Sequence, residues 1–150
     1  MPTIWDPKTR QELLGRFTML TPATSPAWGK MSAIQMVRHC TIAVDMMLGV
    51  TKVAPKLGPF RFAPLRYLVI HVLPWPKGVP TAPELITNSY RGNWENEVRA
   101  LRKSVEAMVA RGFGGQFEGH PACGRLSGED LGVLVHKHLD HLLRQFGLAR

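Results

Sequence analysis

The sequence predicts an all-α fold: a four-helix bundle with a long proline-rich connection between the second and third helices. Four stretches repeat apolar residues every three or four positions, which places them on one face of a helix. Capping residues and glycine stops bound these stretches, and no stretch shows the alternation of a half-buried strand. We therefore predict helices over residues 8–20, 32–48, 93–111 and 128–146, packed around one core in a single domain, residues 1–150.

The first two helices have clear boundary signals. Asp6 is a typical N-cap, and Pro7 suits the first helical position that follows it. Ser32 is the predicted cap of the second helix, and Gly49 is its predicted end. The apolar stripes of the two helices consist of Leu13, Leu14, Phe17 and Leu20, and of Met36, Cys40, Val44 and Met47.

The connection that follows is irregular and basic. It holds seven of the 12 prolines, and a short helix is predicted only near residues 65–73. No acidic residue occurs between Asp45 and Glu84, whereas five basic residues do: Lys52, Lys56, Arg61, Arg66 and Lys77. Such a stretch suits nucleic acid, an anionic membrane surface, an acidic small molecule, or plain solvation as a surface loop. We favour the solvated loop and consider nucleic acid the weaker alternative, because no nucleic-acid-binding motif accompanies the charge.

The last two helices are equally well marked. Asn93 begins the third, and a glycine-rich loop from Gly112 to Gly124 follows it. Ser127 caps the fourth, with Asp130 three residues later as in a capping box. Their apolar stripes consist of Trp94, Val98, Leu101, Val105 and Met108, and of Leu131, Leu134, Val135, Leu142 and Phe146.

Composition places the chain among ordinary globular proteins. Its 150 residues are 45% hydrophobic and carry a net charge of +8. The two cysteines, Cys40 and Cys123, form neither a disulfide framework nor a Cys-x-x-Cys metal motif, and Cys40 is predicted to be a buried structural thiol. The longest apolar run, residues 67–73, is far below the roughly 20 residues of a membrane span. Without a signal-peptide pattern, we expect a cytoplasmic protein that has no membrane contact.

Histidines are the residues that point to chemistry. His138 and His141 are three positions apart on the fourth helix, so both rings share a face that is predicted to point inward. His136 falls off that face and is predicted to contact solvent. His39, on the second helix, is placed to approach the pair across the bundle. Three histidines and a water form a familiar catalytic zinc shell, and imidazole also suits nickel and iron. The alternative, which we weigh equally, is a set of hydrogen-bonded polar residues at the end of the bundle.

Three further residues have two possible roles or a packing role near the site. His120 either belongs to a loop that closes over the bundle mouth or to a turn before the fourth helix, and we favour the turn. His71 lies among apolar residues and is predicted to pack there. Trp28 either lines a pocket or anchors its loop, and we favour the anchor.

Several of these motifs together resemble the DinB-like (DinB/YfiT-type) superfamily of metalloenzymes, in particular a bacterial branch known as a domain of unknown function. The resemblance spans roughly residues 10–147 and rests on Trp28-Gly29-Lys30-Met31, Gln35-Met36, His39, Pro74-Trp75-Pro76-Lys77-Gly78, His120-Pro121 and Lys137-His138-Leu139-Asp140-His141-Leu142-Leu143-Arg144-Gln145-Phe146-Gly147.

The resemblance implies a metal site at one end of the bundle. Its ligands in the superfamily match His39 on the second helix, and His138 and position 142 on the last. Position 142 is leucine here, so either His141 substitutes as the third ligand or the site is degraded. The expected cofactor is a divalent Zn, Ni or Fe ion, together with a low-molecular-weight thiol as cosubstrate.

The leading functional expectation is a metal-dependent enzyme of the thiol-transferase type that acts on a small molecule. Arg144, Lys77 and Arg38 are candidates to bind an acidic group of the substrate. The alternative is a non-catalytic, stress-related binding bundle that has lost its metal site. A homodimer is an open alternative for the oligomeric state.

Overall fold

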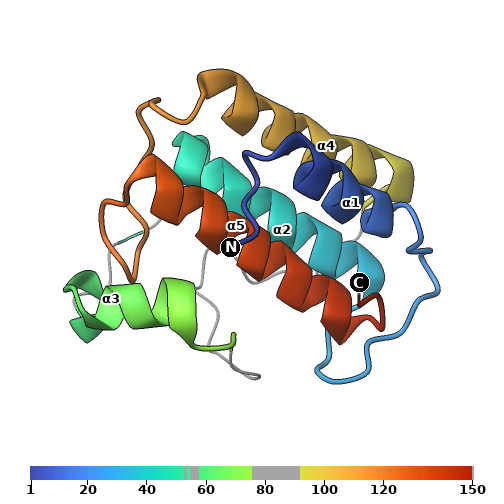
Figure 1. Cartoon of the computed structure of the whole chain (residues 1–150). Coiled ribbons are helices and arrows are strands. Elements are labelled where there is room, and N and C mark those ends of the chain that lie inside the picture. The colour runs from blue at the N-terminus through green and yellow to red at the C-terminus, as the bar shows by residue number, and fades with distance from the viewer. Residues whose placement is uncertain (53, 55–57, 76–91, 150) are drawn as a thin grey trace.

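The computed structural model describes residues 1–52, 54, 58–75 and 92–149, and the fold of this part is all-helical (Figure 1). Its regular elements are α1 (Pro7–Phe17), α2 (Ala33–Leu48), η1 (Pro59–Arg61), α3 (Leu65–Tyr67), the single π-helical turn η2 (Leu68–Val72), α4 (Trp94–Arg111) and α5 (Gly128–Gln145). The four long helices lie side by side, with α2 packed against α4 and α5, and with α1 packed against α5.

The predicted caps explain why these helices begin where they do. The Asp6 side chain accepts from the backbone N–H of Thr9, and Ser32 forms a reciprocal capping box with Gln35. Asn93 and Ser127 accept backbone N–H groups at the starts of α4 and α5. The predicted helix bounds are confirmed to within one residue, except that α1 ends at Phe17 instead of residue 20.

One main hydrophobic core lies between the four long helices. The predicted stripes supply it, and Ile4, ahead of α1, adds a fully buried side chain. The largest fully buried side chains in the helices are Leu13, Met36, Leu101, Met108, Leu131, Leu139 and Leu143. None of the described helices is long and apolar enough to cross a membrane.

Val105 provides a test of this core, because its side chain on α4 is 0% exposed. Val105→Ala is expected to lower the free energy of unfolding by about 2 kcal/mol, from lost burial and the cavity left behind. The measurement is urea unfolding followed by circular dichroism. The matched control is Val50→Ala, where the side chain is 71% exposed and a change below about 0.5 kcal/mol is expected. Equal losses in the two variants would contradict this placement of the core.

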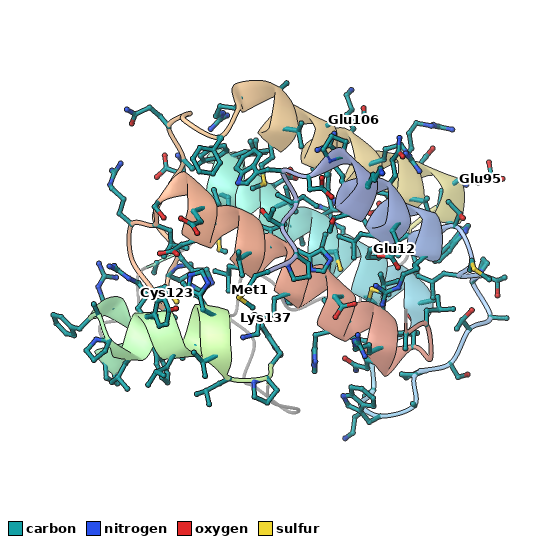
Figure 2. All side chains as sticks on the ribbon, in the orientation of Figure 1. Met1, Glu12, Glu95, Glu106, Cys123 and Lys137 are labelled. Atoms are coloured by element: carbon teal, nitrogen blue, oxygen red, sulfur yellow. The ribbon has the colours of Figure 1, made fainter. Side chains whose placement is uncertain are left out.

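A short helical segment, formed by η1, α3 and η2, covers part of α5. Ile70 of η2 is buried against Val133 and Leu134 of α5, which forms a second, smaller core. The Lys137 ammonium donates to the backbone carbonyls of Val69 at 2.6 Å and Ile70 at 3.3 Å, and to that of Leu73. Figure 2 shows Lys137 reaching from α5 to the end of this segment. The short helix predicted near residues 65–73 is therefore confirmed. It is held against α5 by the packing of Ile70 and by the hydrogen bonds of Lys137.

A buried ion pair joins α1 to α5 and to the C-terminal segment. The Arg16 guanidinium donates to Asp140 Oδ1 at 2.7 Å and to the Leu148 carbonyl at 2.6 and 2.9 Å. Arg144 donates to the other oxygen of Asp140 at 2.9 Å. Burial by itself would raise the pKa of Asp140, but the hydrogen bonds from Arg144 and Arg16 outweigh it and lower that pKa.

Candidate functional site

The centre of the candidate site is a pair of histidines on different helices. His39 of α2 and His138 of α5 approach with their Nε2 atoms 3.2 Å apart and their rings nearly perpendicular. The apolar face of α2 packs in the core, and His39 is buried with it on the helix that contacts α5. The convergence of His39 and His138 predicted from the sequence is confirmed.

The separation of 3.2 Å between the two nitrogens permits two arrangements. In one, a neutral imidazole donates an N–H···N hydrogen bond to the other. In the other, both nitrogens take corners of a tetrahedral metal shell, where Zn–N bonds of about 2.0–2.1 Å put two ligands roughly 3.3 Å apart. The metal shell requires two neutral rings, and the hydrogen bond requires a neutral ring as acceptor. Burial, with smaller effects of the charges of His39, His120 and His141, lowers the pKa of His138 well below its ordinary value.

Two tryptophans form the walls of this site. Trp75 stacks on His138, with ring centroids 4.6 Å apart and planes 9° from parallel. Trp28 lies 5.8 Å from the His141 ring, and its carbonyl accepts from Gln145 at 2.9 Å. Trp28 is therefore both anchored and part of the wall, which combines the two roles considered from the sequence. The role of Trp75 was missed, although the two prolines that flank it were a signal of a fixed backbone.

His141 is brought close to the site without completing a metal shell. Its ring lies 6.0 Å from that of Trp75, on the same side of α5 as His138. Within the described ranges, no group of three or more His, Cys, Asp or Glu side chains is placed to hold a metal ion. Leu142, at the position of the expected third ligand, is 4% exposed and packs in the main core. His39 and His138 are thus assembled, whereas ligation by His141 stays a prediction.

His120 lies in the turn that the sequence predicted before α5. Its backbone pairs with Gly124 in both directions, at 2.7 and 2.8 Å. Its Nδ1 accepts from the backbone N–H groups of Ala122 at 3.0 Å and Cys123 at 3.1 Å. Burial lowers the pKa of His120 to about 4. The turn is thus confirmed.

Two of the three candidates to bind an acidic group of the substrate already have partners. Arg144 is bonded to Asp140, and Arg38 lies 3.9 Å from Glu97, while Lys77 lies outside the described residues. Burial raises the pKa of the Cys40 thiol, so this neighbour of His39 stays protonated, as expected of a structural thiol.

One prediction about the histidines was wrong, and another was incomplete. His136 was expected to contact solvent but is only 5% exposed, because the N-terminal segment covers that face of α5, with Ile4 N bonded to the Gly132 carbonyl. His71 was expected to pack, and its side chain is only 12% exposed, but the sequence did not predict that its Nε2 lies 2.6 Å from an oxygen of Asp130. Its ring also lies 4.7 Å from that of Tyr67.

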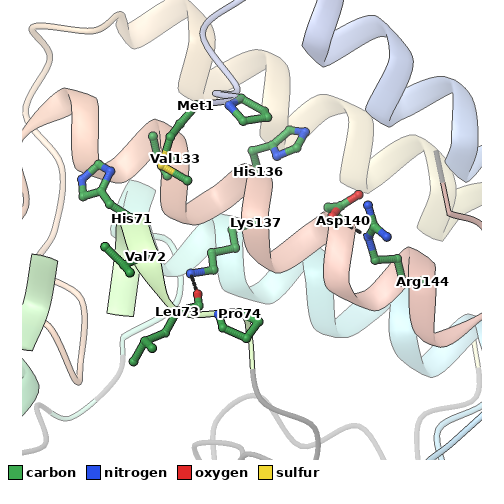
Figure 3. Close-up of a pocket in the computed structure, with 11 residues that line it drawn as sticks. Met1, His71, Val72, Leu73, Pro74, Val133, His136, Lys137, Asp140 and Arg144 are labelled. Atoms are coloured by element: carbon green, nitrogen blue, oxygen red, sulfur yellow. Dashed lines mark hydrogen bonds and ion pairs between the residues drawn. The ribbon is translucent and has the colours of Figure 1, made fainter. Parts of the chain in front are cut away.

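A hollow of about 310 Å³ lies on another face of α5 (Figure 3). The charged groups in it are engaged with neighbouring groups: Lys137 with backbone carbonyls, and Asp140 with Arg144. His39 and His138 do not line it; its walls are Met1, Pro2, His71, Val72, Leu73, Pro74, Val133, His136, Lys137, Asp140 and Arg144. We therefore place the candidate site at the histidine pair.

Comparison with known proteins gives no match to this chain among protein family models, curated proteins or solved structures.

Proposed function

We propose that this chain is a metal-dependent enzyme that acts on a small molecule, built on a four-helix bundle of the DinB-like type. The observation that carries the proposal is the His39–His138 pair, whose nitrogens are separated by 3.2 Å. Two imidazoles from facing helices are a recurrent way to build a metal site in a bundle. The resemblance in the second-helix and last-helix motifs supports the same assignment.

The side chains present fit two of the three ligand positions. His39 and His138 are the first two ligands, and His141 is the third ligand in this proposal. When bound, a divalent Zn, Ni or Fe ion supplies positive charge that lowers the pKa of a coordinated low-molecular-weight thiol. Burial lowers the pKa of His138, which favours the neutral ring that metal ligation needs.

The aromatic walls have a separate role in the proposal. Trp75 against His138, and Trp28 beside His141, place apolar surface next to the polar pair. Such walls exclude water and hold the apolar part of a small substrate, while the histidines fix the reacting end. This combination favours a small molecule over a macromolecule as the ligand, and the thiol-transferase-type chemistry in the proposal comes from the resemblance.

A second candidate function is favoured by one observation. Leu142 packs in the core where the superfamily pattern has a ligand, and the described residues contain no three-ligand group. On this alternative the protein is a non-catalytic, stress-related bundle that binds a small molecule between the histidine pair and the tryptophans.

Metal content distinguishes the two candidates. Protein purified without a histidine tag is expected to retain about one equivalent of divalent metal, as a single-ion site does. His141→Ala is expected to reduce affinity for added Zn²⁺ by at least about tenfold, since a ligand is lost. The control is His136→Gln, which changes a histidine of α5 that lines the other hollow and should leave metal content unchanged. Circular dichroism shows whether each variant is folded.

Two outcomes would contradict the metal assignment. Equal Zn²⁺ affinity in wild type and His141→Ala removes His141 from the ligand set. If only Leu142→His acquires metal, the natural chain has lost its site and the binding bundle replaces the enzyme.

A further inference from the structure

The short helical segment beside α5, residues 59–74, turns its apolar side chains toward solvent. Every exposed residue in it is apolar or aromatic, whereas its three basic residues, Arg61, Arg66 and His71, are half-buried. Figure 1 shows this segment outside the four long helices. Of the 11 large hydrophobic side chains that are exposed among the described residues, seven lie here and form what we call the apolar patch: Phe60, Phe62, Leu65, Tyr67, Leu68, Val72 and Leu73.

Polar contacts on the inner side hold the segment in this orientation. His71 Nε2 lies 2.6 Å from Asp130 Oδ1 on α5, and Arg66 Nη1 donates to the Arg125 carbonyl at 3.5 Å. Ile70 is 0% exposed and packs against α5. Turning the segment over would cover the apolar patch, but it would break these contacts and expose Ile70. A contiguous apolar surface that the fold keeps outward is typical of an interaction site.

The backbone of the segment is suited to an apolar environment. An unpaired N–H or carbonyl group is costly where no water can reach it. Three of the exposed positions are Pro59, Pro64 and Pro74, which have no backbone N–H. The Lys137 ammonium donates to the carbonyls at the end of η2, which the helix itself leaves without donors.

The charges around the apolar patch are positive. The sequence has no acidic residue between Asp45 and Glu84, and Arg125, which adjoins the segment through its carbonyl, is exposed. The carboxylate that contacts the segment, Asp130, is engaged on the inner side with His71. The complementary partner is therefore both apolar and anionic.

This charge distribution distinguishes between possible partners. A second copy of the chain would bring the same basic border to a twofold contact, so its charges would repel. Nucleic acid is anionic, but its interfaces are polar and would leave the aliphatic side chains of Leu65, Leu68 and Val72 without a matching surface. The surface of an anionic bilayer offers acyl chains and negative headgroups together.

We propose that the apolar patch docks the protein on the surface of an anionic lipid bilayer. Phe60, Phe62 and Tyr67 enter the boundary between headgroups and acyl chains, and Arg125 meets the headgroups. This contact goes beyond the proposed function and needs no helix that spans the membrane. It departs from the expectation of no membrane contact, because the length of apolar runs does not show which apolar side chains stay exposed.

Flotation of the full chain with lipid vesicles tests the proposal. The probes are vesicles of phosphatidylcholine alone and vesicles in which about one-third of the lipid is phosphatidylglycerol. EDTA is present throughout, so the result does not depend on the proposed metal site. Wild type is expected to float with the anionic vesicles and about tenfold less with the neutral ones, since several basic groups lie near the surface.

Phe62→Ser is expected to weaken binding to anionic vesicles about tenfold, because the ring no longer leaves water. Its matched control is Met19→Ser, since both side chains are 69% exposed but only Phe62 belongs to the apolar patch. The control should bind within about twofold of wild type, as for other surface substitutions away from a site. Arg125→Gln should weaken binding about fivefold, and only to anionic vesicles. Circular dichroism checks that each variant is folded.

Three results would overturn the proposal. Wild type that does not float with anionic vesicles has no lipid-binding surface. Equal losses in Phe62→Ser and Met19→Ser, or a loss in Arg125→Gln alone, would mean that lipid attracts the chain by charge without the apolar patch. A wild-type dimer that Phe62→Ser converts to a monomer in sedimentation equilibrium would assign the apolar patch to a second copy.

Discussion

Asp140→Ala is expected to lower the free energy of unfolding by about 2 kcal/mol, less than the cost of leaving a buried charge with no ionic partner, because Glu12 stays beside Arg16. The reason is the Arg16 guanidinium, whose side chain is 8% exposed while that of Asp140 is 19% exposed. Removing the carboxylate takes away the nearer of two anionic partners of this buried charge and leaves the Leu148 carbonyl and Glu12, whose Oε1 lies 3.6 Å from Arg16 Nη1. Urea unfolding at pH 7 measures the loss.

Arg144→Ala is the matched control, because it removes the other partner of Asp140 from a side chain that is 48% exposed. A loss below about 1 kcal/mol is expected there, as for other exposed ion pairs. The pKa of Asp140 is lowered in the folded state, so the contribution of the pair is present above pH 4 and is lost as pH falls further. Similar losses in Asp140→Ala and Arg144→Ala would show that burial of Arg16 is not the cause.

Acidification from pH 7 to pH 4 is expected to destabilise the protein strongly through its neutral histidines. His120 has its pKa lowered to about 4, whereas an unfolded histidine titrates near 6.5. Between these values the unfolded chain binds a proton that the folded chain does not, so stability falls as pH falls. The loss from His120 alone is about 3 kcal/mol at pH 4, and His138 contributes in the same direction.

Urea unfolding at several pH values between 7 and 4 measures this dependence. His120→Asn retains an acceptor for the turn, so it should unfold within about 1 kcal/mol of wild type at pH 7 and show a shallower loss toward pH 4. Parallel curves for wild type and His120→Asn would contradict a lowered pKa of His120 in the folded state.

Local signals explain which parts of the fold were predictable. The starts of α2 and α5 follow from Ser32 and Ser127, whose side chains contact N–H groups three residues away. The His39–His138 contact was also predictable, since both residues follow the apolar stripes of facing helices. These features depend on helix periodicity and on neighbours in sequence.

The features that were missed depend on which distant segment covers each face of α5. His136 is buried because the N-terminal segment lies over it, and Trp75 meets His138 because the proline-rich connection returns to the helix. His71 meets Asp130 for the same reason. Residue spacing within one helix carries no information about which distant segment packs on it. For the same reason, the spacing did not determine the direction of the His141 side chain.

The ammonium of Lys137 makes the position of Trp75 sensitive to a single charge. Its bonds to the carbonyls of Val69, Ile70 and Leu73 supply donors that the end of a helical turn otherwise lacks. Trp75 follows Leu73 by two residues. The hydrogen bond from Lys137 to the Leu73 carbonyl therefore helps to position the backbone that places the indole over His138. Acetylation of Lys137 removes its positive charge, so it would weaken these bonds to the end of η2. The Trp75 indole would then be held less firmly against His138. Lysine acylation on one face of α5 would thus change the access of solvent to the histidine pair on another.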